Sequence, residues 1–447
     1  MSTGNVWIMH REEALLICIL INILPANIEG GVSYLTQTVN NPRGCQIRLR
    51  NLSKKEYLIL ERLTYHSKGV YNNALYAVKN NLLDTDTNCS FLTKLYRYVR
   101  NTDNAKFLHA QSVQAILKQL CYALKKKGCK KLHFMPRDSH RSVVWTNQQV
   151  KLQNNVLCVP LTQVFLDYYN HTHKYVKVRV PEWLKYHKLI RVTLVPRLNA
   201  KYFELHILYD DKRTYPQAKG EHVMGIDLGV SNFATIAISD GTAFIIDGRK
   251  AKSVNQWYNK QKARLRSIYD KQGIKSGRKF VTLTKRRNDW MFNFIHQSAS
   301  QIIKQAIRHR VSKIAIGKNA YWKHGVNIGK KNNSNFVMLP HSKFINILIT
   351  KAKRYGLCVV VTEEAYTSKV DALALEPLNK QNNFIGKRIK RGLFKSSTGL
   401  VINADVNGAI NIARKVFGDD PWKSIPESHT GIGGRGRLAR PRRIRVA

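Results

Sequence analysis

The stretch Met224-Gly225-Ile226-Asp227-Leu228-Gly229 decides the fold of this chain, because it carries a single carboxylate at the tip of an apolar run. The lead-in, Val223 to Ile226, has the composition of a buried strand. Phe233 to Ser239 then predicts a second strand, Asp240-Gly241 a tight turn, and Thr242 to Ile246 the return strand. The segment therefore predicts an Asp on a strand that opens a run of antiparallel strands.

The downstream pattern alternates helices and strands. Helical periodicity covers Gln256 to Gln272 and Thr284 to Arg310, where an apolar stripe marks the buried face (Phe294, Ile295, Ala299, Ile302, Ile303, Ala306). Lys313 to Ile316 and Leu357 to Thr362 predict strands, and between them Ser342 is expected to cap a helix that ends at Tyr355-Gly356. Asp405 starts a last helix that runs to about Phe417. This order of elements is that of an RNase H-like α/β fold.

The upstream half combines helices with short strands. Cys45 to Leu49 alternates as a first strand, and Ser53-Lys54-Lys55-Glu56 is a capping box that opens helical segments reaching about Lys127. Five short strands follow: Val150 to Leu152, Val156 to Pro160, Tyr175 to Val180, Leu189 to Val195 and Tyr202 to Tyr209. We expect an antiparallel barrel or curled sheet, into which the helices are inserted after the first strand.

The charge of the chain points to a polyanionic partner. Lys and Arg number 75 against 28 acids, which gives a net charge of +47. A compact fold with this imbalance repels itself unless a polyanion is bound, and nucleic acid is the obvious one. Rings and cations interleave at Tyr96, Arg97, Tyr98 and Arg100, a mixture that suits base stacking and phosphate neutralisation but also a helix with buried Tyr rings.

Cysteine usage favours a reducing cytoplasm. The seven cysteines are scattered and no two have C-x-x-C spacing, so neither disulfides nor a structural zinc is expected. The apolar run Ala14 to Leu24 has eleven residues, too few to span a bilayer. We expect no membrane partner and a prokaryotic, nucleoid-associated protein.

Asp227 and Asp405 are the candidate catalytic acids. Hydrolysis of a phosphodiester at neutral pH can use two Mg²⁺ about 4 Å apart, with Mn²⁺ as a substitute, held by anionic oxygen ligands from separate strand and helix ends. The alternatives are a strand-end cap for Asp227 and a helix N-cap for Asp405. Actin-like ATPases share the G-I-D-L-G opening, but their further Gly-rich phosphate loops are missing here, and DDE transposases order their acids differently.

In combination, three motifs resemble the TnpB nucleases of insertion sequences, relatives of the type V CRISPR effectors. They are Gly225 to Gly229, Tyr366-Thr367-Ser368-Lys369, and Asn403-Ala404-Asp405-Val406-Asn407-Gly408-Ala409-Ile410-Asn411-Ile412. The resemblance covers about Cys45 to Phe417. It implies a RuvC-like nuclease guided by a transposon-derived RNA, with a wedge barrel and a helical recognition module before it.

The middle acid of this family is displaced here. Members usually carry a Glu in a motif like I-x-x-E-D-L, whereas this strand reads Ile314-Ala315-Ile316-Gly317-Lys318-Asn319. The nearest acids are Glu363 and Glu364, on the tip of the next strand about 4.8 Å away, and one of them is expected to complete the metal site. Lys318 is expected where the Glu is missing and could contact the scissile strand.

The zinc-ribbon cysteines that the resemblance implies are also missing. Asp371 and Ala374 stand in the places of the first pair, and a basic segment fills the later region, with Lys387, Arg388, Lys390 and Arg391 as candidate nucleic-acid contacts. On this basis we expect a poorly ordered extension (1–44), a first wedge strand (45–52), a helical recognition module (53–135), a wedge barrel (136–215), a RuvC-like domain (216–418, with a degenerate zinc-ribbon or target-loading loop at 365–400) and a basic tail (419–447) that is disordered from Gly431.

The function expected from these features is RNA-guided cleavage of double-stranded DNA, with Asp227, Glu364 or Glu363, and Asp405 as metal ligands. The first alternative is a guided DNA-binding protein with a weak or inactive site, which acts as a repressor or transposition accessory. The second is an unguided nuclease or nucleic-acid chaperone.

Overall fold

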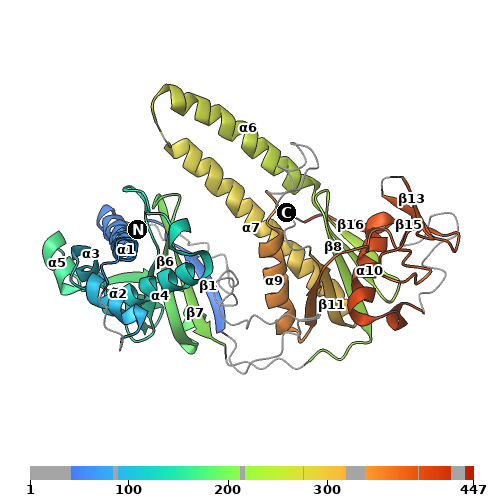
Figure 1. Ribbon diagram of the computed structural model, residues 1–447, viewed down its shortest axis with the longest axis horizontal. Helices are drawn as coiled ribbons and strands as arrows, with labels where there is room; N and C mark the ends of the chain where they lie inside the picture. Colours follow the sequence, from blue (N-terminus) through green and yellow to red (C-terminus); the bar gives the residue numbers. More distant parts are fainter. Residues whose placement is uncertain are drawn as a thin grey trace, which may run out of the picture. The chain divides into compact units, whose positions relative to one another are not determined.

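The structure is a computed structural model that describes residues 42–83, 89–211, 217–274, 276–318, 338–390, 392–423 and 438–446 (Figure 1). The chain divides into two compact units, which comprise residues 42–211 and 217–446 among those described. The predicted extension and the apolar run Ala14 to Leu24 lie outside the described residues.

The first unit is built on a four-stranded antiparallel sheet in the order β1-β7-β6-β2. Its strands are β1 (Pro42–Arg48), β2 (Val143–Thr146), β6 (Lys188–Arg197) and β7 (Tyr202–Asp210). Strand β1 pairs with β7 along its whole length, from Pro42↔Asp210 to Arg48↔Glu204. The helices between β1 and β2 are therefore inserted into a sheet that the first strand has already joined, as the sequence predicts.

The remaining strands of this unit form a separate sheet. Strands β3 (Lys151–Gln153), β4 (Val156–Pro160) and β5 (Tyr175–Arg179) pair antiparallel in the order β3-β4-β5. The five predicted strands are thus present, but the hydrogen-bonded ladders of the described residues divide them between two sheets. The expected closure into one barrel stays a prediction.

The inserted helices pack into one apolar core with the strands of this unit. They are α1 (Lys54–Lys79), α2 (Phe91–Val99), α3 (Asp103–Lys106) and α4 (Ala110–Lys127), and the shorter α5 (Gln163–Tyr169) follows β4. The predicted capping box is confirmed, because the Glu56 amide donates to Ser53 Oγ at 3.2 Å and the Ser53 amide donates to the Glu56 carboxylate at 2.7 Å. Ser53 thus fixes where α1 begins.

The second unit contains a six-stranded sheet in the order β12-β11-β8-β9-β10-β16, in which the edge strand β16 is Arg442–Ile444. Strands β8 (His222–Leu228), β9 (Asn232–Ile238) and β10 (Ala243–Asp247) are antiparallel, and the predicted turn carries Gly241 at φ 81°. Strands β11 (Val311–Gly317) and β12 (Cys358–Thr362) run parallel to β8 on its other side. The predicted order of strand, hairpin and two further strands is confirmed.

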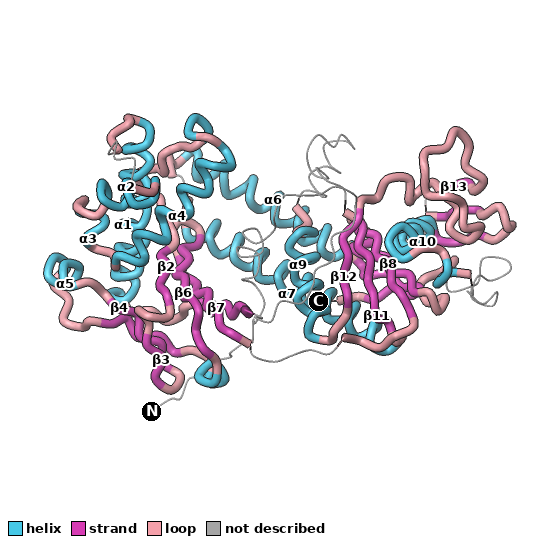
Figure 2. The backbone as a smooth tube through the Cα atoms, turned by 60° about the horizontal axis from the view of Figure 1, so that its bottom comes forward, coloured by secondary structure: helices cyan, strands magenta, loops and turns pink. Residues whose placement is uncertain are grey.

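Helices cover both faces of this sheet (Figure 2). Helices α7 (Arg278–Arg308) and α9 (His341–Arg354) bury one face with Met224 and Ile226, and α10 (Ala404–Phe417) buries the other with Val223. The apolar stripe predicted for α7 is fully buried. Helix α6 (Arg249–Lys271) runs beside α7 (Figure 1). Because strand neighbours face opposite ways, Asp227 shares the α10 face with Val223 and Gly225.

Ser342 does not cap α9, contrary to the sequence prediction. The helix begins at His341 and its N-cap is Pro340, which has no side-chain oxygen to accept a hydrogen bond. His341 is buried and its Nε2 lies 2.9 Å from the Gly229 carbonyl oxygen. This tertiary contact, together with burial of Phe344, sets the start of the helix.

The basic tail contains a strand, which corrects the expectation of disorder from Gly431 onward. Residues Arg442–Ile444 form β16, which pairs parallel with β10 and extends the sheet. Leu438 and Val446 are buried on either side of it. The sequence prediction failed because Arg-rich composition conceals the few apolar residues that anchor the strand.

The segment predicted as a degenerate zinc ribbon is an ordered small sheet within this unit. Strands β13 (Lys387–Lys390), β14 (Leu393–Lys395) and β15 (Val401–Asn403) pair antiparallel in that order.

None of the helices in the described part of the chain has the length and apolar character to cross a membrane.

Candidate catalytic site

Asp227 lies at the end of β8, on the face that α10 covers. The register places it opposite Thr235 of β9. Two residues earlier, a Cβ on Gly225 would overlap the carbonyl oxygen of Ala409 in α10. Only glycine allows this close approach of helix and strand, so Gly225 brings the start of α10 next to Asp227.

Asp405 lies in the first turn of α10 and is not its N-cap. Asn403 is the N-cap, and its Oδ1 accepts from the backbone amides of Asp405 at 3.0 Å and Val406 at 3.3 Å. The Asp405 carboxylate instead accepts a hydrogen bond from Asn232 Nδ2 at 2.6 Å. The capping interpretation of Asp405 is therefore wrong, and its side chain is directed to a neighbour on β9.

Glu364 and Glu363 have different surroundings at the end of β12. Glu363 is exposed, and its carbonyl oxygen accepts from Lys415 Nζ at 3.0 Å. Glu364 is half-buried, and its carboxylate is close enough to Asp227 to perturb that residue's ionisation. Of the two candidates, Glu364 is thus the one whose charge reaches the Asp227 carboxylate.

The Glu364 side chain fills space in front of Gly317, at the end of β11. A Cβ on Gly317 would lie 2.6 Å from Glu364 Oε1 and 2.7 Å from Glu364 Cγ. Counted from Ile314, the Glu of the I-x-x-E-D-L pattern falls on Gly317, which corrects the expectation that Lys318 takes its place. The side chain missing at Gly317 is thus matched by a carboxylate that enters the same space from β12.

The ionisation of these acids reflects burial and mutual repulsion. Burial, followed by the charges of Glu364 and Asp405, raises the pKa of Asp227 well above its usual range, while Arg388 acts in the opposite direction. Burial raises the pKa of Glu364 to about 7. Like charges in a shared, poorly solvated region disfavour ionisation, so a cation would stabilise the three carboxylates together.

The donor chemistry fits a hard divalent cation, because all three groups offer anionic oxygens. In the described residues, however, no three His, Cys, Asp or Glu side chains already stand close enough to hold a metal ion. We therefore treat metal binding as a proposal about Asp227, Glu364 and Asp405.

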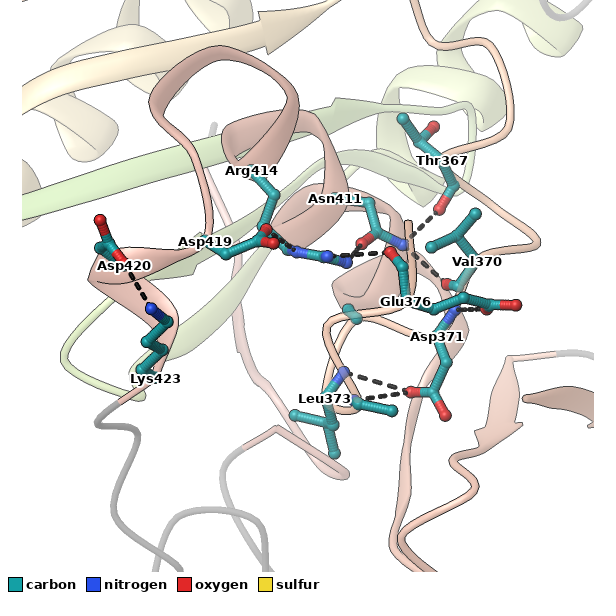
Figure 3. Close-up of polar contacts among 12 residues, drawn as sticks. Thr367, Val370, Asp371, Leu373, Glu376, Asn411, Arg414, Asp419, Asp420 and Lys423 are labelled. Carbon is teal, nitrogen blue, oxygen red and sulfur yellow. Dashed lines mark hydrogen bonds and ion pairs between the residues drawn. The ribbon is translucent and has the colours of Figure 1, made fainter. Parts of the chain in front are cut away.

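The segment after Glu364 is fastened to α10 by a buried polar network (Figure 3). Asn411 Nδ2 donates to the carbonyl oxygens of Thr367 at 2.9 Å and Val370 at 2.7 Å, and Asn407 Nδ2 donates to Val370 at 2.8 Å. Asn407 and Asn411 therefore satisfy backbone groups. Through these bonds, the helix that carries Asp405 also holds the chain that leaves Glu364.

Asp371 takes over an organising role where the family pattern has a cysteine. Its Oδ1 accepts from the amides of Leu373 at 3.2 Å and Ala374 at 3.3 Å (Figure 3). Its Oδ2 accepts from Ser396 Oγ at 2.8 Å and the Ser397 amide at 2.7 Å. One fully buried carboxylate thus joins the two loops that the family resemblance places in the degenerate ribbon.

The predicted nucleic-acid contacts are only partly placed. Lys387, Arg388 and Lys390 lie on β13 with exposed side chains, and Arg388 is close enough to influence Asp227. Lys318 is exposed after β11, and its amide donates to the Thr362 carbonyl oxygen at 2.8 Å. Arg391 lies outside the described residues.

In α2 of the first unit, the predicted ring-and-cation cluster is split between core and solvent. Tyr96 and Tyr98 are half-buried against the apolar core, and Arg97 and Arg100 are exposed. This arrangement leaves both interpretations of the cluster open for the rings, while the guanidinium groups face solvent.

Three residues around the acids were assigned no role in the sequence analysis: Asn232, Gly317 and Asn403. Asn403 had a usable signal, since an Asn immediately before an amphipathic helix is a preferred N-cap. Gly317 could have been found by placing the I-x-x-E-D-L pattern residue by residue. Asn232 had no local signal, because its partner Asp405 is 173 positions away.

Sequence comparison finds similarity to transposon-type and Cas12f1-like proteins. Residues 206–323 match the family described as "Probable transposase" (OrfB_IS605), and residues 341–412 match "Cas12f1-like, TNB domain". Over 228 residues the chain is 26% identical to the "TnpB-like protein ORF457" of Acidianus two-tailed virus. The predicted resemblance to TnpB-type proteins is confirmed. The aligned region covers 48% of this chain and 46% of the viral protein, so the chain matches about half the length of this curated relative.

Structural comparison supports the fold. The cryo-EM structure of a Cas12f1–sgRNA–target DNA complex matches with a TM-score of 0.54 and 16% identity, over 81% of this chain and 83% of the Cas12f1 chain. At this identity the match concerns the fold alone. It confirms the α/β class and a Cas12f1-like fold.

Proposed function

We propose that this chain is an RNA-guided DNA endonuclease of the TnpB type, with a RuvC-like catalytic domain that begins near residue 216 and includes β16. The observation that carries the proposal is the relocated carboxylate, because Glu364 occupies the space in front of Gly317 and its charge reaches Asp227. Two acids at the ends of β8 and β12, the strands on either side of β11, and a third at the start of α10 supply a complete set of anionic oxygens. The strand order around β8 is that expected of an RNase H-like sheet.

In this proposal Asp227, Glu364 and Asp405 hold divalent cations, Mg²⁺ or Mn²⁺. When bound, two such ions would activate a water and neutralise charge on the attacking and leaving oxygens of a phosphodiester. The chain's own residues orient the carboxylates. Asn232 fixes one Asp405 oxygen, Gly317 leaves room for Glu364, and Arg388 brings a positive charge near Asp227 that can also attract the phosphate.

Guide RNA and double-stranded DNA are the proposed partners. The family resemblance, the net charge of +47 and the likeness to a Cas12f1 chain solved with sgRNA and target DNA support them. The helical module of the first unit would hold RNA and heteroduplex by their backbones, with the exposed Arg97 of α2 and the exposed Arg100 that follows α2 as phosphate contacts. Base pairing would then supply the choice of sequence.

The proposal is tested in two steps. Sequencing of the RNA that co-purifies with the protein should return one structured transcript from the flanking DNA, and random cellular RNA would refute guidance. Cleavage of a matched target in Mg²⁺ should then be lost in Asp227→Ala and Glu364→Ala and retained in Glu363→Ala. Glu363→Ala is the matched control, because it removes an equal charge one residue away from an exposed position.

A second candidate is guided DNA binding without cleavage. It is favoured by one observation, that within the described residues the acids do not already converge to metal-binding spacing. Wild-type protein that binds a matched target but leaves it intact in both Mg²⁺ and Mn²⁺ would establish this function and exclude the nuclease.

A further inference from the structure

Asn232 links the Asp405 carboxylate to the C-terminal strand. Its Nδ2 donates to Asp405 Oδ2 at 2.6 Å, and its Oδ1 accepts from an Arg443 guanidinium nitrogen (NH2) at 2.8 Å. The amide thus lies between a carboxylate of α10 and a guanidinium of β16. These two contacts join positions that are 173 and 211 residues from Asn232 in the sequence.

Arg443 is itself held in place by the sheet. Strand β16 pairs with β10 so that Arg443 is opposite Ile245. A second guanidinium nitrogen (NH1) of Arg443 lies 3.6 Å from Asp247 Oδ1 at the end of β10, and Asp247 is buried. In the β9–β10 ladder, Asp247 is the register partner of Asn232. Arg443 therefore contacts both members of the cross-strand pair Asn232 and Asp247.

The chemistry of these groups fixes the orientation of the Asn232 amide. A primary amide has one donor end and one acceptor end, whereas a guanidinium only donates and a carboxylate only accepts. Arg443 therefore requires Oδ1 on its side, which leaves Nδ2 for Asp405. Without Arg443, a flip of the amide would point Oδ1 at the carboxylate and repel it.

We propose that Asn232 and Arg443 are positioning residues for Asp405, so that the C-terminal strand belongs to the catalytic site. This inference rests on the proposed function. The Arg-rich tail then has a role beyond attraction of phosphates, because its Arg443 contacts Asn232 and thereby orients Asp405. Such supporting residues around ligand carboxylates typically alter metal affinity or activity by about 10- to 100-fold when removed.

The test compares Arg443→Ala with Arg442→Ala. Both variants lose one positive charge from an exposed position of the same strand, so their loss of nucleic-acid affinity should be equal. Adjacent strand residues face opposite ways, so only Arg443 can reach Asn232. We expect Arg443→Ala to lower the single-turnover cleavage rate about 10-fold or more, and Arg442→Ala to keep the rate of the wild type.

A double variant separates positioning from general stability. Because Arg443 acts through Asn232, Asn232→Ala combined with Arg443→Ala should cleave no more slowly than Asn232→Ala alone. The readout besides activity is Mn²⁺ affinity, measured by electron paramagnetic resonance, which should weaken in Arg443→Ala and not in Arg442→Ala. If Arg443→Ala loses the strand, Arg443→Lys keeps the charge and is expected to fall between Arg443→Ala and the wild type.

The outcomes distinguish this inference from the proposed function. Equal rates and equal Mn²⁺ affinities in Arg443→Ala and Arg442→Ala, with both lost in Asp227→Ala, would overturn the positioning role alone. If Asp227→Ala behaves like the wild type in both measurements, the proposed function fails and the positioning role fails with it.

Discussion

Gly317→Ala is expected to displace the Glu364 carboxylate and impair catalysis. The added Cβ would lie 2.6 Å from Glu364 Oε1 and 2.6 Å from Ile412 Cδ1. Both distances are well inside van der Waals contact, so the carboxylate and the methyl group must move. Overpacking of this kind costs about 1–3 kcal/mol in stability. A shift of about 1 Å in a reacting group can cost about 100-fold in rate.

Two measurements follow the effect. Thermal unfolding gives the loss of stability, and single-turnover cleavage of a matched target gives the loss of rate, which we expect to be about 10- to 100-fold. Ile412→Val is the control for the apolar contact, because it removes the crowded methyl group and leaves the carboxylate contact in place. Gly317→Ala in the Ile412→Val background should therefore recover part of the stability and little of the rate.

The decisive variant combines Gly317→Ala with Glu364→Ala and Ile412→Val. With both crowded groups removed, the added methyl group has room, and the stability cost of Gly317→Ala should disappear, a coupling of about 0.5–3 kcal/mol. A cost that persists in this background, or wild-type cleavage by Gly317→Ala alone, would refute the reasoning that Glu364 fills the space at Gly317.

Three further predictions concern the carboxylates of Glu364, Glu204 and Asp371. Burial raises the pKa of Glu364 from 4.5 to about 7, so the folded protein holds this proton more tightly than the unfolded chain and its stability falls as pH rises through this range. In denaturant titrations of the metal-free protein, Glu364→Gln should therefore raise the free energy of unfolding by about 1–3 kcal/mol at pH 8 and by much less at pH 4. Burial alone would raise the pKa of Glu204, but the hydrogen bond from His206 and the charge of Arg197 outweigh it and lower the pKa to about 2. The ionised Glu204 therefore stabilises the fold fully above pH 4.5, and this contribution is lost as pH falls toward 2. Glu204→Gln should remove up to about 3 kcal/mol of this acid dependence of the free energy of unfolding. Asp371→Asn should lower the stability measured by thermal unfolding by about 2–4 kcal/mol, because the buried donors of Ser396 and Ser397 lose a charged acceptor. A loss equal within error to that of the exposed control Asp138→Asn would contradict the organising role of Asp371.

Local patterns were sufficient for most elements of the second unit. The β8–β10 hairpin, the buried stripe of α7 and the strands β11 and β12 follow from periodicity and turn residues, which are properties of a short window of sequence. The start of α9 and the strand β16 did not follow, because His341 and Leu438 are placed by contacts with distant residues.

The candidate site shows the same division. Asp227 and Asp405 stand in motifs that can be recognised without a structure. Glu363 and Glu364 could not be separated by sequence, because adjacent residues at a strand end differ only in which way they face. The structure separates them through exposure of one and the proximity of the other to Asp227.

The sequence by itself determined the net charge, the order of helices and strands and two of the three candidate acids, because charge, periodicity and local motifs can be read from short stretches of sequence. The tertiary structure decided how the third carboxylate is supplied and how the first two are held. Gly317 makes room for Glu364, and Asn232 ties Asp405 to Arg443, across separations of 47, 173 and 211 residues. Contacts over such distances depend on strand register and helix packing, which only the folded chain fixes.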